Sequence, residues 1–142
     1  MELSQEAAES LSRHFAAIYH YCHPIYTFSL SHQAVRTLQF IHYQPEATVS
    51  DVAAHLRSAH NTASEIVHRL AEKGLLHKKR KDDDERAVRL SLTEQGTQVL
   101  YEQTGLDVQH LSACLSQLSV EEQDLILSGV TLLAEHLGMR EI

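Results

Sequence analysis

The segment from Lys78 to Gly96, KKRKDDDERAVRLSLTEQG, constrains the fold of this chain most strongly. Four basic residues open it, and an acidic run, Asp82–Glu85, follows. Beyond that run every second residue is apolar, in the order Val88, Leu90 and Leu92. This alternation is the period of a half-buried strand. The segment therefore predicts a β-hairpin that turns at Asp82–Glu85 and runs into a helix with Thr93 as its N-cap and Glu94 in its first turn.

Two short amphipathic helices are predicted just before the hairpin, over Ser50–Leu56 and Asn61–Lys73. Ser50 is the expected N-cap of the first helix, with Asp51 in its first turn. The apolar residues of the two helices recur at helical spacing: Val52, Ala53, Leu56, Ala63, Ile66, Val67 and Leu70. Gly74 follows the second helix, where a left-handed residue would end it. Two such helices followed by a hairpin predict a winged helix-turn-helix, with the second as its recognition helix.

The outer face of this recognition helix is polar, and its side chains are of the kinds that reach base edges or phosphates. The candidates for DNA contact are His60, Asn61, Thr62, Ser64, His68 and Arg69. Three of them have a second interpretation, in which His60 fills the turn and Thr62 and Ser64 cap the helix. Glu65 on the same face is either a surface acid or a reader of cytosine.

With these elements the chain resembles the MarR family of winged helix-turn-helix regulators. The residues that carry the resemblance are Leu70, Gly74, Leu75, Leu76, Asp84, Glu85, Arg86, Val88, Leu90, Leu92, Thr93 and Gly96. The resemblance covers Ser31–Gly96 and reaches the flanking helices only through their arrangement. It implies that Arg86 lies at the tip of the hairpin and enters the minor groove, and that Asp84 supports the conformation of the hairpin. The alternative for Arg86 is a solvated charge.

The basic strand of the hairpin supplies the remaining candidates for DNA contact: Lys78, Lys79, Arg80 and Lys81. Because successive strand residues point to opposite faces, only half of these cations can face DNA at once. We therefore expect about two phosphate contacts from this strand in each subunit.

The net charge of −7 would argue against nucleic-acid binding if the charges were spread evenly, but they are not. Ser50–Leu92 holds nine Lys or Arg and seven Asp or Glu, a net charge of +2. The rest of the chain holds three bases and twelve acids, a net charge of −9. The cations are thus clustered where contact with phosphates requires them.

At 142 residues the chain is expected to form a single domain, residues 1–142, that is mainly helical with a small β-hairpin. Residues 31–96 form the expected DNA-binding lobe, and residues 1–28 and 97–142 form the expected dimerisation helices. We expect a first helix over Ser4–His23 with Ser4 as N-cap, and a second helix that begins after Ser31. Thr48–Val49 is expected to be a short strand that pairs with the hairpin.

The C-terminal part is expected to hold a long helix, Thr93–Gln117, and a last helix that Ser119 and Glu122 open as a capping box and that ends at Leu137. The apolar residues of the last helix cover more than one face: Leu125, Ile126, Leu127, Val130, Leu132, Leu133 and Leu137. This excess predicts a partner surface. Terminal helices packed against their two-fold mates would give a homodimer, whose recognition helices about 34 Å apart would select a pseudo-palindromic operator in double-stranded DNA.

A metal site is an alternative to consider for this chain, because eleven histidines are many for its length. His20, Cys22 and His23 lie close in sequence, and His110 and Cys114 stand four apart on one helix face. His20 and Cys22 point to different faces of a helix, so that cluster cannot form one site unaided. Some members of the family sense zinc through such helices, but the ligand pattern is not reproduced here. We therefore expect no metal and no other cofactor.

Thiol sensing is a related alternative, since the peroxide-sensing branch of the family has a reactive cysteine early in its first helix. That position falls near Ala8 here, where the chain has no cysteine. Cys22 lies near the expected C-terminus of a helix, where the dipole disfavours a thiolate. We expect Cys22 to be buried and inert.

The resemblance also implies an effector pocket, because the family binds small aromatic or phenolic ligands between the dimerisation helices and the DNA-binding lobe. The candidate lining residues are Tyr19, His23, Tyr26, Phe28, His42 and Tyr43. The alternative is ordinary core and interface packing.

We expect a sequence-specific DNA-binding transcription regulator, a homodimeric repressor that a small-molecule ligand releases from DNA. The alternatives are a metal- or thiol-responsive regulator of the same fold and a winged-helix module for protein association. We expect no enzyme, because the chain has no Gly-rich phosphate loop, no G-x-S-x-G motif and no acid pair in a recognisable context. Without a long apolar run or a secretory signal, we expect a cytoplasmic protein.

Overall fold

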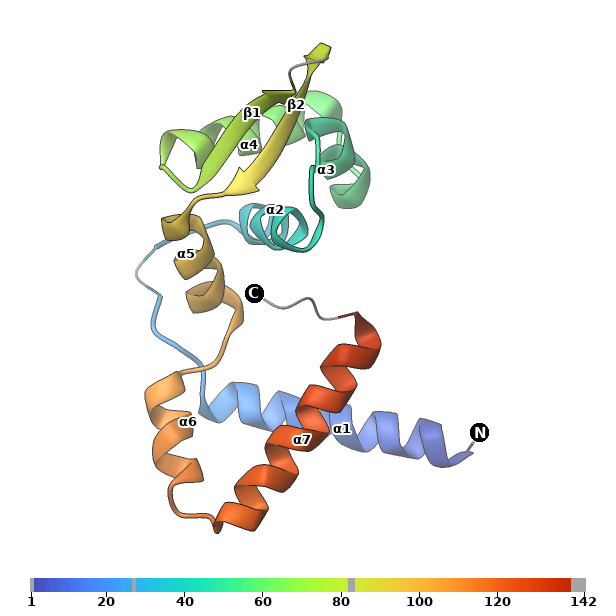
Figure 1. The fold of residues 1–142 in the computed structure, drawn as a ribbon, viewed down its shortest axis with the longest axis vertical. Helices are drawn as coiled ribbons and strands as arrows, with labels where there is room; N and C mark the ends of the chain where they lie inside the picture. Colours follow the sequence, from blue (N-terminus) through green and yellow to red (C-terminus); the bar gives the residue numbers. More distant parts are fainter. Residues whose placement is uncertain (1, 27, 82–83, 139–142) are drawn as a thin grey trace. The chain divides into compact units, whose positions relative to one another are not determined.

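Seven helices and one hairpin make up the part of the chain that the computed structural model describes, which is residues 2–26, 28–81 and 84–138. The side chains of residues 2, 81 and 84–87 lie outside that description. The elements in Figure 1 are α1 (Glu2–Tyr21), α2 (His32–Tyr43), α3 (Val49–Leu56), α4 (His60–Glu72), β1 (Leu76–Lys81), β2 (Asp84–Leu92), α5 (Glu94–Thr104), α6 (Val108–Leu115) and α7 (Val120–Leu137). They fall into two compact units, residues 25–105 and residues 1–24 with 106–142.

The core of residues 25–105 is built from α2, α3, α4, the hairpin and α5. Its fully buried large side chains are Leu38, Val52, Val67, Leu70 and Leu75. Burying each of these contributes about 1.5–3 kcal/mol relative to an exposed position. The apolar faces predicted for the two short helices meet in this core, so the winged helix-turn-helix prediction is confirmed.

The start of α3 differs from the sequence-based expectation. Thr48 is the N-cap: its side chain accepts a hydrogen bond from the Asp51 backbone at 3.2 Å, and the Asp51 carboxylate accepts one from the Thr48 backbone at 2.9 Å. Ser50 lies inside the helix, so its assignment as N-cap was wrong. The Thr48–Val49 strand was also wrong, because this capping box commits both residues to a helix start. Among the described residues, a backbone hydrogen bond from Leu90 N to Ala47 O at 2.8 Å joins β2 to the residue before this cap.

This capping box makes a direct prediction. Thr48→Ala removes the oxygen that accepts from the Asp51 backbone, so we expect the free energy of unfolding to fall by about 1 kcal/mol. Ser50→Ala is the matched control, since Ser50 is exposed and makes no cap, and it should leave stability within about 0.5 kcal/mol of the wild type. Chemical denaturation of both variants measures this. Equal losses in the two would show that Thr48 is not the cap.

The hairpin, here called the wing, pairs β1 with β2 in antiparallel register from Leu76 opposite Leu92 to Arg80 opposite Val88. The register then shifts, so that Lys81 lies opposite Asp84. The turn was expected over residues 82–85, but the backbone of residues 84 and 85 belongs to β2. Residues 82 and 83 lie outside the described part of the chain. Leu76 and Leu90 are buried, so the face that they share packs against the core.

Helix α5 begins where the sequence predicted, at Thr93. The Thr93 hydroxyl accepts from Gly96 N at 2.9 Å and donates to Gly74 O at 2.7 Å, which ties the end of β2 to the end of α4. Gly74 has a φ of +77°, the left-handed conformation expected after the recognition helix. Gly96 lies against the backbone of the residue that follows this glycine, Leu75.

The other unit, residues 1–24 and 106–142, contains α1, α6 and α7. Helix α1 already begins at Glu2, so Ser4 lies inside it and its assignment as N-cap was wrong. The long helix expected over residues 93–117 is in fact two helices. Gly105 follows α5 in an extended conformation, and the Asp107 side chain caps α6 by accepting from His110 N at 3.1 Å. The Ser119 capping box and the end of α7 at Leu137 are confirmed.

The packing of this second unit is sparse in the described residues. Helices α6 and α7 bury none of their residues, and Cys22 is the buried residue among those described in this unit. Its carbonyl accepts a hydrogen bond from Asp107 N at 2.7 Å. No helix in the described part of the chain is both long and apolar enough to cross a bilayer.

Candidate nucleic-acid interface

The outer face of α4 carries the predicted DNA-contacting residues. Their side chains are all exposed: His60, Asn61, Thr62, Ser64, His68 and Arg69. The buried residues Ala63, Val67 and Leu70 hold the opposite face in the core, so the helix cannot rotate this polar face away from solvent. The arrangement is that of a helix presented to an external partner.

The first turn of α4 is left without a side-chain cap. Its N-cap is Ala59, which makes no capping hydrogen bond. Thr62 and Ser64 therefore do not cap this end, and their alternative interpretation as caps was wrong. Backbone N–H groups at an uncapped helix start are partners for an anion, because they carry the positive end of the helix dipole. A DNA phosphate beside His60 would satisfy them.

One exposed ion pair lies farther along α4 among the described residues. His68 Nε2 lies 3.1 Å from Glu72 Oε1, one turn away, and both side chains are more than 60% exposed. Such a surface pair is weak, so it holds His68 only loosely and leaves it able to turn toward a base edge. Arg69 beside it is exposed.

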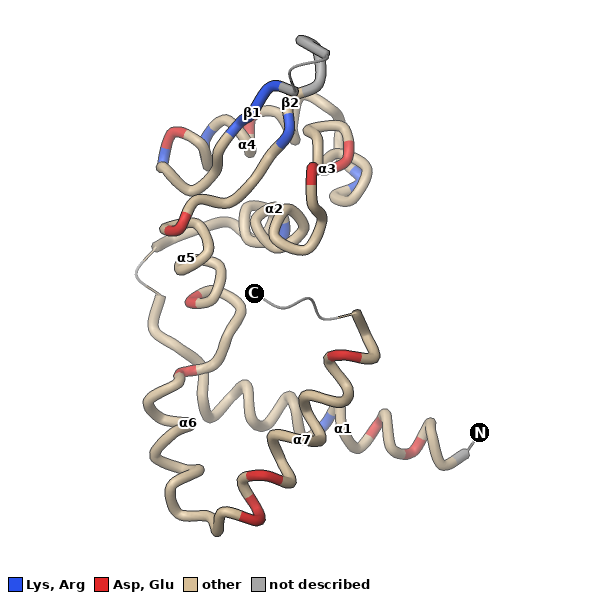
Figure 2. Tube along the Cα trace, viewed as in Figure 1, with Lys and Arg blue, Asp and Glu red and all other residues tan. Residues whose placement is uncertain are grey.

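The wing adds cations next to α4, and Figure 2 shows them on both neighbouring strands. Lys78, Lys79 and Arg80 are exposed. Successive strand residues point to opposite faces of the wing. Lys78 and Arg80 therefore share the face of the core residue Leu90, whereas Lys79 lies on the other face. The side chains of Lys81, Asp84 and Arg86 lie outside the described residues, so their assigned roles stay predictions.

The six candidate pocket residues do not all belong to one unit: Tyr19 and His23 lie in residues 1–24, and Tyr26, Phe28, His42 and Tyr43 lie in residues 25–105. Within the first group the rings of Tyr19 and His23 meet edge to face at 4.7 Å. Within the second group, the centroid of the His42 ring lies 4.8 Å from that of Tyr43 and 6.1 Å from that of Tyr101. Tyr101 escaped the sequence analysis because nothing in its local pattern distinguishes it from a surface residue of α5.

Of the hollows among the described residues, two lie each within one unit, and none of the six candidates lines either of these two. One, of about 470 Å³, lies between α2 and α3 where the rings of Phe40 and His55 stack at 4.4 Å. The other, of about 520 Å³, lies along α6 and the start of α7. Both are open at the surface, so neither is by itself an enclosed effector site.

Among the described residues no group of three or more His, Cys, Asp or Glu side chains could hold a metal ion. Cys22 is buried, as expected for an inert thiol, and Cys114 is exposed, and both are free.

Comparison with known proteins agrees with this geometry. Residues 30–88 match the family model of the MarR family. A mutant of MepR from a multidrug-resistant S. aureus clinical isolate is 25% identical with a TM-score of 0.57, over 78% of this chain and 81% of that one. FabT from Streptococcus pneumoniae, in complex with DNA, is 22% identical with a TM-score of 0.55, over 94% and 96% of the two chains.

A third similar structure is PcaV from Streptomyces coelicolor in complex with its natural ligand, 22% identical with a TM-score of 0.51 over 91% of this chain and 89% of that one. No curated protein matches the sequence. The family match spans the helix-turn-helix and most of the wing, and the solved structures share the fold over most of the chain. Residues 30–88 are therefore similar in sequence to the MarR family of transcription regulators, and the chain shares its fold with the solved MepR and FabT structures.

Proposed function

We propose that the protein is a homodimeric repressor that binds a pseudo-palindromic operator and leaves it when a small ligand binds. The observation that carries the proposal is the polar outer face of α4 beside the cationic wing, in a chain that is otherwise strongly acidic. Base edges would be read by α4, and phosphates would be held by its N-terminus and the wing. This role places the protein in the cytoplasm together with the DNA that it binds.

Related proteins support the DNA-binding part of the proposal. FabT and MepR, which share the fold, have been solved in complex with DNA. The sequence-specific contacts are assigned to Asn61, His68 and Arg69, because these exposed side chains offer the donors and acceptors that base edges require. Arg86 is assigned to the minor groove and Asp84 to the support of the wing.

The homodimer is supported by apolar surface that a single chain leaves in water. The side chains of α7 that are large, apolar and exposed are Val120, Leu125, Ile126, Leu127, Val130, Leu132, Leu133 and Leu137. On α1 they are Leu3, Leu11, Phe15, Ile18 and Tyr21. Exposed apolar surface on this scale is typical of an association site. A second copy of the chain covers both helices symmetrically, which a two-fold axis permits.

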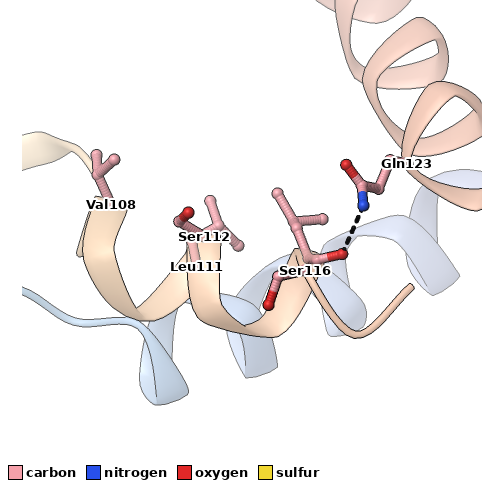
Figure 3. A pocket seen from close by; sticks show the side chains of 6 residues that line it. Val108, Leu111, Ser112, Ser116 and Gln123 are labelled. Atoms are coloured by element: carbon pink, nitrogen blue, oxygen red, sulfur yellow. Dashed lines mark hydrogen bonds between the residues drawn. The ribbon is translucent and has the colours of Figure 1, made fainter. Parts of the chain in front are cut away.

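The hollow along α6 adds to this surface (Figure 3). Its lining is Val108, Leu111, Ser112, Leu115, Ser116 and Gln123. Gln123 is fixed at one end, because its Nε2 donates to Leu115 O at 2.9 Å and to Leu118 O at 3.2 Å. The apolar residues beside it are left for side chains of the partner subunit.

The effector part of the proposal rests on the aromatic and histidine side chains of the six pocket candidates. A small aromatic or phenolic ligand would stack on such rings and bond to their polar tips. PcaV, which shares the fold, has been solved with its natural ligand. A ligand that binds one spacing of the two DNA-binding lobes more tightly would shift the dimer away from operator binding.

The test is a fluorescence anisotropy titration of the purified protein against the DNA upstream of its own gene and a scrambled control, each at two salt concentrations. Tight binding that prefers the first DNA and weakens steeply with salt supports the regulator. Absence of binding to any DNA at low salt would replace it with the protein-association module.

Two variants separate the roles of the wing residues. Arg86→Ala is expected to weaken binding most at A·T-rich flanks of the operator, because a side chain in the minor groove senses its width. Lys79→Ala is expected to weaken binding to all sequences alike and to lower the salt dependence, because it loses a phosphate contact. Titrations against operators with A·T-rich and G·C-rich flanks measure both effects. Unchanged operator affinity in Arg86→Ala would remove the wing-tip assignment.

A further inference from the structure

Two cations lie directly opposite each other on the outer face of the wing. Lys79 in β1 and Arg89 in β2 are Cα partners in the antiparallel ladder, and the Lys78–Leu90 pair separates them from the pair of His77 and Ser91. Side chains of directly opposed residues point to the same face, with their Cβ atoms about 4.5–5.5 Å apart. Like charges in that position destabilise a hairpin, so this pairing needs a physical reason.

Neither cation has an acidic partner among the residues whose side chains the structure describes. The ion pair found there is the one on α4, between His68 and Glu72. Arg89 is half-buried, and its Nε is shielded from solvent without a hydrogen-bond partner. Buried donors are nearly always bonded, so an unpaired guanidinium N–H points to a missing acceptor. Turning this guanidinium toward an acceptor breaks no hydrogen bond at Nε.

The neighbouring pair fits the same acceptor. His77 and Ser91 are exposed on the same face of the wing, two residues along each strand from Lys79 and Arg89. The Ser91 hydroxyl is a donor, and the His77 ring can offer an N–H beside it. The face thus offers an ammonium, a guanidinium and a hydroxyl together, a donor set that suits a tetrahedral anion with several oxygens.

We infer that Lys79 and Arg89 form one anion-binding site on the outer face of the wing, and that its occupant is a backbone phosphate of DNA. The inference rests on the proposed function and adds Arg89 to the DNA-contacting residues. A phosphate between the two side chains converts their mutual repulsion into two charge-assisted bonds. Arg89 is therefore a positioning contact that fixes the wing on the sugar-phosphate backbone and carries no base preference.

The experiment measures DNA affinity against salt concentration for the wild type, Arg89→Gln and Arg89→Lys, with operator and scrambled DNA. Arg89→Gln is expected to weaken binding to both DNAs by about tenfold and to reduce the slope of log affinity against log salt by about 0.9, the value of one phosphate contact. Arg89→Lys keeps the charge and should keep most of the slope. Arg13→Gln is the matched control, because it removes one exposed cation from α1 and should leave the slope unchanged.

A double-mutant cycle tests whether the phosphate is shared. The loss caused by Arg89→Gln should be smaller in a Lys79→Gln background, since residues that bind one group are not additive. Fully additive losses would assign the two cations to separate phosphates and overturn the single site. A slope in Arg89→Gln equal to that of the wild type would overturn the contact itself. Wild-type protein that binds no DNA at low salt would instead remove the proposed function.

Thermal unfolding without DNA separates binding from structure. Arg89→Gln relieves the repulsion with Lys79, so its Tm should equal or exceed that of the wild type. A clear fall in Tm in both Arg89→Gln and Arg89→Lys would make Arg89 a packing residue of the wing and overturn the inference. Inorganic phosphate serves as the second probe. If it stabilises the wild type but not Arg89→Gln while the DNA slopes are equal, the site takes free anions and its assignment to DNA is overturned.

Discussion

Replacing Gly96 with alanine is expected to lower the free energy of unfolding by about 3 kcal/mol or more. A Cβ at this position would lie 2.0 Å from Leu75 O and 3.0 Å from the Leu75 carbonyl carbon. The obstacle is backbone, and it cannot move aside as the end of a side chain can. The same Leu75 carbonyl accepts from Thr93 N at 3.1 Å, and the Leu75 side chain is fully buried.

Gly74→Ala is the matched control for this prediction. Gly74 has a positive φ, but a Cβ there would meet only the Gln95 side chain at an ordinary 3.6 Å. Its cost is therefore that of a left-handed alanine, about 1–2 kcal/mol. Denaturant unfolding of both variants gives the comparison, and Gly96→Ala should also lower Tm by more than about 10 °C. If Gly96→Ala were no less stable than Gly74→Ala, α5 would not approach the Leu75 backbone.

The elements whose apolar residues face one core could be predicted from the sequence. The helical spacing of residues 63, 66, 67 and 70 predicted α4, and the alternation of residues 88, 90 and 92 predicted β2. An element that buries one face carries apolar residues at its own structural period. Where a helix begins was harder. Thr48 and Ser50 are both good caps, and the reciprocal bond from Asp51 decides between them only once the backbone is folded.

The break of the long C-terminal helix was missed for a related reason. Gly105 lies in a stretch of residues that are otherwise compatible with a helix, and glycine alone does not end one. Asp107 caps α6 and so provides a second helix start. The exposed surface of α7 also shows no clear periodic signal, because its apolar residues extend around more than one side of the helix.

One part of the candidate site could be predicted from the sequence and another part could not. The exposed face of α4 followed from its buried face, since the two are complementary on one helix. The pairing of Lys79 with Arg89 did not follow, because it depends on the register between two strands. Only the folded hairpin shows that the second cation of the pair comes from β2.

The second large effect is expected at α7, where Leu132→Glu should convert a dimer into a monomer and reduce operator affinity by at least about 100-fold. Leu125 and Leu132 are 75% and 68% exposed in the single chain and lie on one side of α7, two turns apart. A carboxylate there would have to be buried against the partner subunit without a counter-ion. The free-energy cost of burying this charge exceeds the stabilisation that the apolar contacts around it provide. Adding Leu125→Glu should complete the dissociation at micromolar concentration.

Leu132→Met is the matched control, because it keeps an apolar side chain of similar volume at the same position. Light scattering after size-exclusion chromatography measures the mass, and anisotropy measures operator binding. The buried core of residues 25–105 contains no residue of α7, so a monomeric variant should keep the cooperative unfolding of its DNA-binding unit. Monomeric Leu132→Glu that still bound the operator with wild-type affinity would mean that one recognition helix suffices. Dimeric Leu132→Glu would instead place the two-fold contact away from this side of α7.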